Sequence, residues 1–157
     1  MKLYHGSNMT VDVIDLTKGS KGKDFGRGFY LSEDLQQAIQ MADITTERRG
    51  FGEPSISAFE FDEDMASALN ILRFDGYTEA WAKFVIQNRK NTMDVQCHDF
   101  DIVYGPIADD RVGLTIRLYE EELLDINDVI RRLEYVSPTF QYFFGTEKAI
   151  KTLKRLL

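Results

Sequence analysis

Cysteine, histidine and proline are scarce in this chain of 157 residues, which contains one Cys, two His and three Pro. The single thiol, Cys97, cannot form an internal disulfide, and a free thiol agrees with a reducing compartment. One Cys and two His are too few for a four-ligand zinc site of the usual spacing unless carboxylates complete it. We expect no bound metal, because a chain of this length buries a core large enough to fold without one.

Long apolar runs are also absent from the sequence. No segment approaches the roughly 20 apolar residues that cross a bilayer, and the first residues lack the apolar run of a signal peptide. We therefore place the protein in the cytoplasm, with no membrane partner. A formal net charge of −7 opposes binding to phosphate backbones, so nucleic acid is not an expected partner either.

No internal repeat, low-complexity tract or linker divides the chain, which predicts a single domain over residues 1–157. Short runs rich in aromatic and β-branched residues, bounded by turn residues, indicate strands. These runs are Lys2 to His5, Gly28 to Ser32, Ser55 to Phe61, Phe100 to Tyr104 and Thr139 to Phe144.

Apolar residues spaced three and four apart indicate helices between and after these strands. The expected helices run from Glu33 to about Thr45 with Ser32 or Asp34 as N-cap, around Ala80 to Val85, from Val112 to Tyr119, from Ile126 to Leu133 after Asp125, and after Thr146 with Ala149, Ile150, Leu153 and Leu156 on one face. Because strands and helices do not alternate strictly, the pattern predicts an α+β fold with a mostly antiparallel sheet and peripheral helices.

Two short segments at either end of a long glycine-rich stretch carry the chemistry. His5-Gly6-Ser7 ends the first strand with an imidazole, a residue that allows close backbone approach, and a hydroxyl. Gly26-Arg27-Gly28-Phe29-Tyr30 opens the next strand. The stretch between Gly6 and Gly26 reads as a long loop, and loops of that length are uncommon unless they serve a function. Taken singly, each histidine, glycine or tyrosine here is as readily explained by core packing or turn geometry.

In this joint order, the two segments resemble the ADP-ribosyltransferase superfamily, in its diphtheria-toxin and poly(ADP-ribose) polymerase branch with a His-Tyr-Glu signature. The resemblance implies a split sheet and NAD as co-substrate. It further implies that His5 binds a ribose hydroxyl, that the Gly6 backbone holds the nicotinamide amide, and that Tyr30 stacks on the nicotinamide ring. We expect the side chains of His5, Tyr30 and Gln141 to open onto one pocket.

The remaining NAD-binding positions follow from the same resemblance. Ser7, Arg27 and Gly28 belong to the two motifs. Ala38 and Met41 stand where the polymerases have a serine that holds the amide and a second stacking aromatic. Spacing alone favours core packing of the helix as the explanation for both residues.

The third position of the signature departs from the family. Gln141 stands where the catalytic glutamate is usual, and an amide can hold ribose hydroxyls but cannot act as a base. Glu147, six residues further on, is the alternative source of a carboxylate, although an acid in a helix's first turn also serves the helix dipole. The substitution disfavours chain elongation and fits single ADP-ribose transfer or weak NAD hydrolysis.

The whole chain resembles a bacterial family of small domains of this type that are suspected of acting in toxin–antitoxin or defence modules. The implied function is transfer of one ADP-ribose to an unidentified acceptor, with an antitoxin as a further partner. Two alternatives remain: a catalytically silent module that binds NAD or ADP-ribose, and a protein-interaction domain whose glycines serve only as turns.

Overall fold

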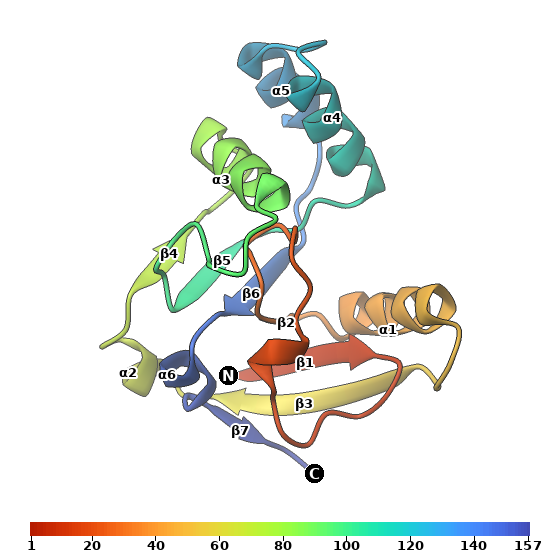
Figure 1. Ribbon diagram of the computed structural model, residues 1–157, viewed down its shortest axis with the longest axis vertical. Helices are drawn as coiled ribbons and strands as arrows, with labels where there is room; N and C mark the ends of the chain where they lie inside the picture. Colours follow the sequence, from red (N-terminus) through yellow and green to blue (C-terminus); the bar gives the residue numbers. More distant parts are fainter.

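The computed structural model describes residues 1–157, apart from the side chain of Asp110. The chain forms an α+β fold in which two small sheets lie against each other and helices cover their outer faces (Figure 1). The strands are β1 (Lys2–Ser7), β2 (Phe29–Leu31), β3 (Ser55–Phe61), β4 (Ile71–Arg73), β5 (Ile102–Pro106), β6 (Phe140–Phe144) and β7 (Leu153–Arg155).

Most helices begin at a side chain that accepts a hydrogen bond from a free backbone N–H of the first turn. Asp34, Thr78 and Asp125 cap three of them in this way. The helices are α1 (Leu35–Arg49), α2 (Glu63–Ala66), α3 (Glu79–Lys90), α4 (Asp110–Glu120), α5 (Ile126–Leu133) and α6 (Glu147–Ile150), with a short 3-10 turn, η1 (Leu16–Lys18).

The sheet is split into two parts. One part has the strand order β1-β3-β7 and is antiparallel throughout. The other has the order β2-β6-β5-β4 and is antiparallel except for the parallel pair β4 and β5. A single bridge, Tyr4 to Ser32, joins the two parts between β1 and β2. The predicted α+β class with a split, mostly antiparallel sheet is therefore confirmed.

Two apolar clusters lie on opposite faces of the four-stranded sheet, because alternate residues of a strand point to opposite sides. Phe143 of β6 packs with Trp81, Val85 and Ile116 of the helices α3 and α4. Its neighbours in β6, Tyr142 and Phe144, point to the other face. There they pack between the two sheets with Leu3, Phe59 and Phe61.

Several predicted elements have the bounds that the sequence indicated. The strand Ser55–Phe61 and the helix Ile126–Leu133 after Asp125 are confirmed. Of the two proposed caps of α1, Asp34 is the N-cap, since its carboxylate accepts from the N–H groups of Gln36 and Gln37. The helix runs four residues beyond the predicted end and stops at Gly50, whose φ of 76° gives a left-handed C-cap.

The expected last helix is wrong. Only Glu147–Ile150 is helical, and Leu153–Arg155 instead forms the edge strand β7 on β3. The apolar spacing of Leu153 and Leu156 fits a helix. A strand at this place instead pairs with the backbone N–H and C=O groups along the edge of β3, which a helix would leave unpaired. The strand β4, which pairs in parallel with β5, is not predicted by the sequence analysis.

In the part of the chain with described side chains, no helix is long and apolar enough to cross a membrane.

Candidate functional site

The candidate site lies where β1 and β2 separate. The backbone of Tyr4 exchanges two hydrogen bonds of 2.8 Å with that of Ser32, and these hold the two sheets together at one point. Beyond that bridge β1 continues along β3, whereas β2 continues along β6. The two strands thus leave a split with Gly6 and Ser7 on one side and Tyr30 and Phe29 on the other.

The peptide groups of Gly6 face this split. Along a strand, backbone groups point alternately to either neighbour. The N–H and C=O of Gly6 therefore point the same way as those of Tyr4, toward β2. No described residue accepts from or donates to them. An unpaired donor and acceptor, side by side in one residue, form a ready site for a ligand that offers the complementary pair.

A glycine is also required at this position by packing. A Cβ on Gly6 would lie against the backbone carbonyl of Ala38 and close to the nitrogen of Ala42, both in α1. The helix therefore rests directly on β1, which explains why Ala38 is 3% exposed. Gly6 serves the packing of α1 with its absent side chain and leaves its peptide groups free for other contacts.

His5 connects the two sides of the split. Its Nδ1 lies 2.7 Å from the carbonyl oxygen of Tyr30. A carbonyl can only accept, so Nδ1 carries the hydrogen and Nε2 has a lone pair. Nε2 has no partner within the described residues. Since it is not among the buried atoms without one, it reaches solvent.

The imidazole of His5 is kept neutral by its surroundings. Burial lowers the pKa of His5 most strongly, the hydrogen bond to the Tyr30 carbonyl opposes this effect, and the positive charges of Arg49 and Lys23 lower the pKa further. The ring also stacks on Phe29, with centroids 4.2 Å apart. At neutral pH, His5 thus presents an acceptor rather than a cation.

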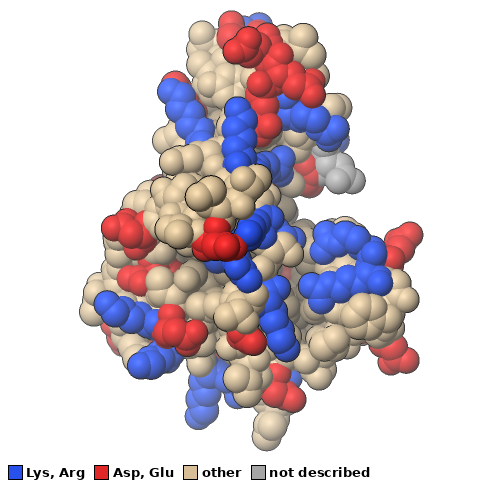
Figure 2. Space-filling view, in the orientation of Figure 1, with Lys and Arg blue, Asp and Glu red and all other residues tan. Residues whose placement is uncertain are grey.

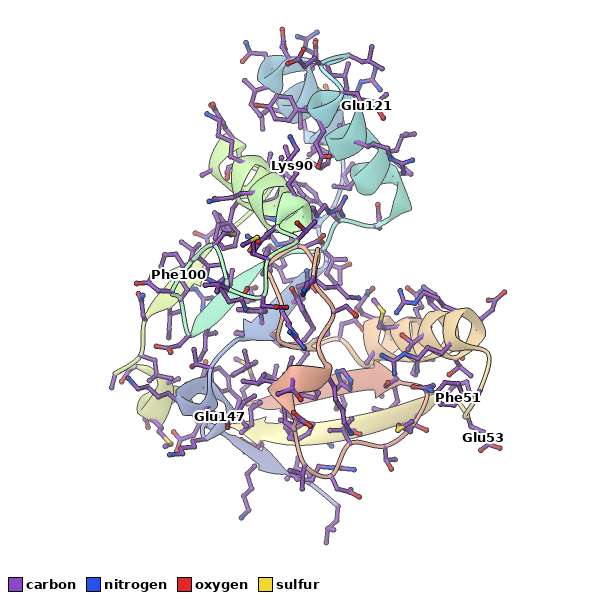
Figure 3. All side chains as sticks on the ribbon, in the orientation of Figure 1. Phe51, Glu53, Lys90, Phe100, Glu121 and Glu147 are labelled. Carbon is purple, nitrogen blue, oxygen red and sulfur yellow. The ribbon has the colours of Figure 1, made fainter. Side chains whose placement is uncertain are left out.

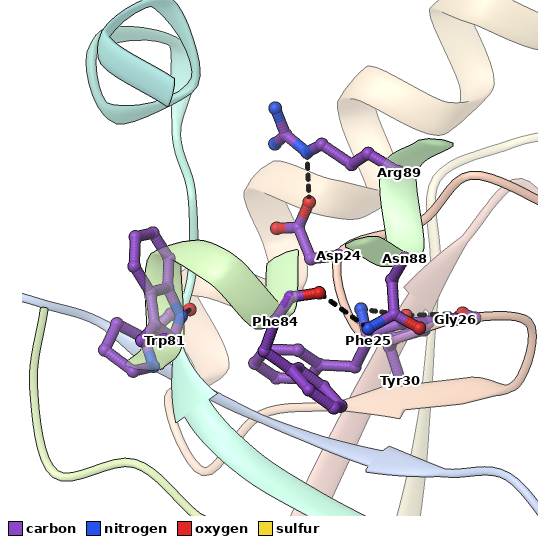
Figure 4. A network of polar contacts seen from close by, with 9 residues as sticks. Asp24, Phe25, Gly26, Tyr30, Trp81, Phe84, Asn88 and Arg89 are labelled. Atoms are coloured by element: carbon purple, nitrogen blue, oxygen red, sulfur yellow. Dashed lines mark hydrogen bonds and ion pairs between the residues drawn. The ribbon is translucent and has the colours of Figure 1, made fainter. Parts of the chain in front are cut away.

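Tyr30 is fixed by hydrogen bonds at its hydroxyl (Figure 4). The hydroxyl donates to the carbonyl of Gly26 at 2.6 Å and accepts from the N–H of Phe25 at 3.1 Å. Its ring packs on Phe143 at a centroid distance of 5.3 Å. Burial raises the pKa of Tyr30 well above its ordinary value. Tyr30 as a residue is half-buried, and its ring packs between Phe25 and Phe143.

The structure does not place His5, Tyr30 and Gln141 on one face of the sheet, so the predicted common pocket for the three side chains is wrong. Tyr30 pairs with Phe143 across β2 and β6, and Gln141 lies two residues before Phe143. Gln141 therefore shares a face with Tyr30. The expectation is wrong for the His5 ring, which stacks on Phe29 and so lies on the opposite side of β2. His5 meets Tyr30 through the backbone carbonyl alone.

The segment before β2 is tightly built. Gly26 has φ of 103°, a conformation that favours glycine. A Cβ on Gly28 would strike the ring of Phe143. The backbone of Arg27 exchanges two hydrogen bonds with the side-chain amide of Gln96, and its guanidinium donates to the carbonyl of Thr17. These contacts fix the segment before β2 and leave the Arg27 side chain turned toward the loop that contains Thr17.

The remaining predicted NAD-binding residues lie on β1 and α1. Ser7 is buried and donates to the side-chain oxygen of Asn8. That same oxygen accepts from Arg49 at 2.9 Å, which ties the end of β1 to the end of α1. Met41 is 37% exposed, one turn after the buried Ala38. Met41 is thus the more accessible of the two predicted positions on α1.

Glu147 lies apart from Gln141. It is exposed at the first position of α6, next to α2, as Figure 3 shows. Gln141 is near the start of β6, and Glu147 follows the end of that strand, where Thr146 donates to the carboxylate of Asp101 at 2.7 Å. Three residues of strand and a turn separate the two side chains, so the structure does not bring Glu147 to the Tyr30 face.

His98, whose ring holds the backbone of the segment before β2, was not identified by the sequence analysis. Its Nε2 lies 2.7 Å from the carbonyl oxygen of Phe25, and its Nδ1 accepts from the N–H of Phe100 at 3.1 Å. Together with the Tyr30 hydroxyl, this ring holds the Phe25–Gly26 turn in place. No local sequence signal marks the role, because Phe25 and His98 are 73 residues apart.

Other features of the surface lie away from the split. A groove of about 580 Å³ between α3 and the α4–α5 connection is lined by residues that include Lys83, Tyr119 and Leu123. Within the described side chains, no three His, Cys, Asp or Glu residues converge as a metal site requires.

Fold and site together define a small α+β protein with a split sheet and an open polar edge at the split. The sequence matches a family described as protein of unknown function (DUF3990) over residues 1–155. The chain therefore belongs to this family. No curated protein matches it.

Proposed function

We propose that this protein is a mono-ADP-ribosyltransferase that binds NAD in the split between β1 and β2 and transfers ADP-ribose to an unidentified acceptor. The unpaired N–H and C=O of Gly6 carry the proposal. The carboxamide of nicotinamide offers one acceptor and one donor in the complementary arrangement. Two backbone hydrogen bonds from a rigid strand would fix the orientation of the ring.

Side chains around Gly6 supply the other contacts that such a substrate requires. The Tyr30 ring is the stacking surface in this proposal, and Met41 lies exposed on α1. A thioether adapts to an irregular apolar surface, which suits the opposite face of a planar ring. The free Nε2 of His5 accepts a hydrogen bond from a ribose hydroxyl. His5 makes this contact from the Phe29 side of β2 and not from a pocket that it shares with Tyr30.

The reaction consists of one substitution at C1′ of the nicotinamide ribose. The bond from C1′ to the nicotinamide nitrogen breaks, and its electron pair leaves with nicotinamide, which becomes neutral. A nucleophilic atom of the acceptor forms a new bond to C1′ and releases its proton to solvent. Positive charge develops on the ribose as in glycoside cleavage, so the site must orient the sugar and stabilise that charge.

Gln141 limits what the site can do. Its amide is free of partners within the described residues and shares the Tyr30 face, where it can hold ribose hydroxyls. An amide carries no charge and accepts no proton at neutral pH. Single transfer to a reactive acceptor, or slow hydrolysis of NAD, is the matching activity. We further propose a cytoplasmic toxin–antitoxin or defence module as the setting, with an antitoxin as partner.

The test is nicotinamide release from NAD by the purified protein, with and without bacterial extract as acceptor. We expect release that rises with extract, and adenylate-labelled ADP-ribose attached to a discrete acceptor. A protein that binds NAD in calorimetry but releases no nicotinamide under either condition would instead be the silent binding module, which the amide at position 141 favours. If the protein does not bind NAD, the remaining alternative is a protein-interaction domain.

A further inference from the structure

A groove at the end of the molecule formed by α3, α4 and α5 (Figure 1) has no part in the proposed function. Its volume is about 580 Å³, and it lies between α3 and the segment 120–125, which we call the α4–α5 turn. The half-buried side chains of Ile86, Tyr119 and Leu124 line the groove and also pack against the core cluster around Trp81 and Val85. Apolar surface of the core therefore reaches the groove.

The chain bends sharply beside this groove at Glu122, whose φ of 62° lies in the left-handed region. The N–H groups of Glu122 and Leu123 donate to the carbonyls of Tyr119 and Leu118, a pattern that ends many helices and usually has glycine at the left-handed position. A glutamate there carries backbone strain. After this bend Leu123 is 67% exposed. The α4–α5 turn thus presents an exposed leucine beside an apolar groove.

Charges of opposite sign line the two walls. The lining includes Lys83 and Lys90 of α3 and, from the α4–α5 turn, Glu120, Glu122 and Asp125. Among the described side chains no ion pair crosses the groove, and Lys83 pairs with Glu79 of its own helix at 2.7 Å. Figure 2 shows acidic side chains gathered at the top of the molecule, with basic side chains next to them. A partner that enters the groove must offer acidic groups to α3 and basic groups to the turn.

We propose that a second copy of this chain occupies the groove, so that the protein forms a two-fold symmetric dimer. In this dimer each copy inserts Leu123 into the groove of the other, and its acidic α4–α5 turn meets Lys83 and Lys90 of the other copy. One surface carries the exposed leucine, the apolar groove and both signs of charge, so it complements itself. The dimer does not depend on the proposed function, because the groove lies away from the split.

Sedimentation equilibrium of the whole chain, from about 1 µM to about 1 mM, measures this association. We expect the average mass to rise from 18.1 kDa toward twice that value. Leu123→Asp should raise the dissociation constant at least about 10-fold, because the dimer would bury a carboxylate in an apolar groove. The matched control is Leu114→Asp on α4, outside the groove, where the side chain is 50% exposed. This control should dimerise like the parent, and circular dichroism verifies that each variant folds.

A charge exchange tests the pairing of the two walls. The basic-wall variant combines Lys83→Glu with Lys90→Glu. The acidic-wall variant combines Glu120→Lys with Glu122→Lys. Each variant alone should be monomeric, because like charges then face each other in the dimer. An equimolar mixture of the two should form a heterodimer, since every contact between the walls again joins opposite charges.

The control for net charge combines Lys148→Glu with Lys151→Glu, at exposed positions away from the groove, and should dimerise like the parent. A parent that stays monomeric over the whole concentration range overturns the proposal in favour of a different partner. A dimer that persists in Leu123→Asp places the contact elsewhere and also overturns it. A mixture of the two wall variants that stays monomeric contradicts the two-fold pairing of the walls.

Discussion

The Nδ1 atom of His5 lies 2.7 Å from the carbonyl oxygen of Tyr30 and so spans the split between β1 and β2. The bond lies beyond the Tyr4–Ser32 bridge, where no ladder joins the two strands. One side chain therefore bridges the opening and, through the tautomer that this hydrogen bond requires, leaves an acceptor at Nε2.

Stability in mild acid depends on His5. Its folded-state pKa lies below the ordinary 6.5, chiefly because of burial. Below pH 6.5 the unfolded chain takes up the proton first, so the free energy of unfolding falls as pH drops through the folded-state pKa, and the full contribution is present above 6.5. We expect His5→Gln to show a weaker loss of stability over this window in urea titrations. Identical pH profiles for the two proteins would contradict a lowered pKa.

Tyr30 combines a structural hydroxyl with the ring that we propose stacks on nicotinamide. Tyr30→Phe should destabilise the fold by about 1–3 kcal/mol, because the Gly26 carbonyl and the Phe25 N–H lose their shared partner. It should leave NAD affinity nearly unchanged. Tyr30→Ala should cost about 3–5 kcal/mol of stability and also weaken NAD binding by about 1–3 kcal/mol. Calorimetry at a temperature where both variants are folded makes the comparison, and equal NAD affinity in Tyr30→Ala removes the ring from the site.

Gly6 should tolerate no side chain. Gly6→Ala places a methyl group against the Ala38 carbonyl, which forces α1 away from β1 and should destabilise the protein by about 1–3 kcal/mol. Gly76→Ala is the matched control, because a Cβ there meets nothing within 4 Å. Urea denaturation of both variants measures the difference. A Gly6→Ala protein as stable as the control would show that the contact with α1 is not tight.

The late carboxylate and amide should behave differently. Gln141→Glu should keep or raise nicotinamide release, since a carboxylate on the Tyr30 face stabilises the developing positive charge. Gln141→Ala should reduce it, and Glu147→Gln should leave it unchanged, because Glu147 lies beyond the far end of β6. Loss of release in Glu147→Gln, with the fold intact, would restore Glu147 as the catalytic acid.

The apolar pattern of a segment predicted its secondary structure correctly where the segment's own residues determine whether it forms a helix or a strand. Ser55–Phe61 alternates along its length, and Ile126–Leu133 carries both its cap and its apolar stripe. Leu153–Arg155 was predicted as helix, because the open edge of β3 that recruits it is formed by residues far away in the sequence.

The candidate site shows the same division. The motifs around His5 and Tyr30 were visible as sequence, and their meeting at the split follows from the order of the strands. The side of β2 on which the His5 ring lies could not be predicted. It depends on how β1 packs beside β2, and no local signal records that packing.

The Gly6 amide provides the most direct test of the account, because its N–H faces the split without a partner. In ¹⁵N–¹H correlation spectra, titration with NAD should move the Gly6 resonance downfield and slow its exchange with water, as a new hydrogen bond requires. Nicotinamide alone should move it in the same direction. A Gly6 resonance that stays in place at saturating NAD would contradict binding in this split.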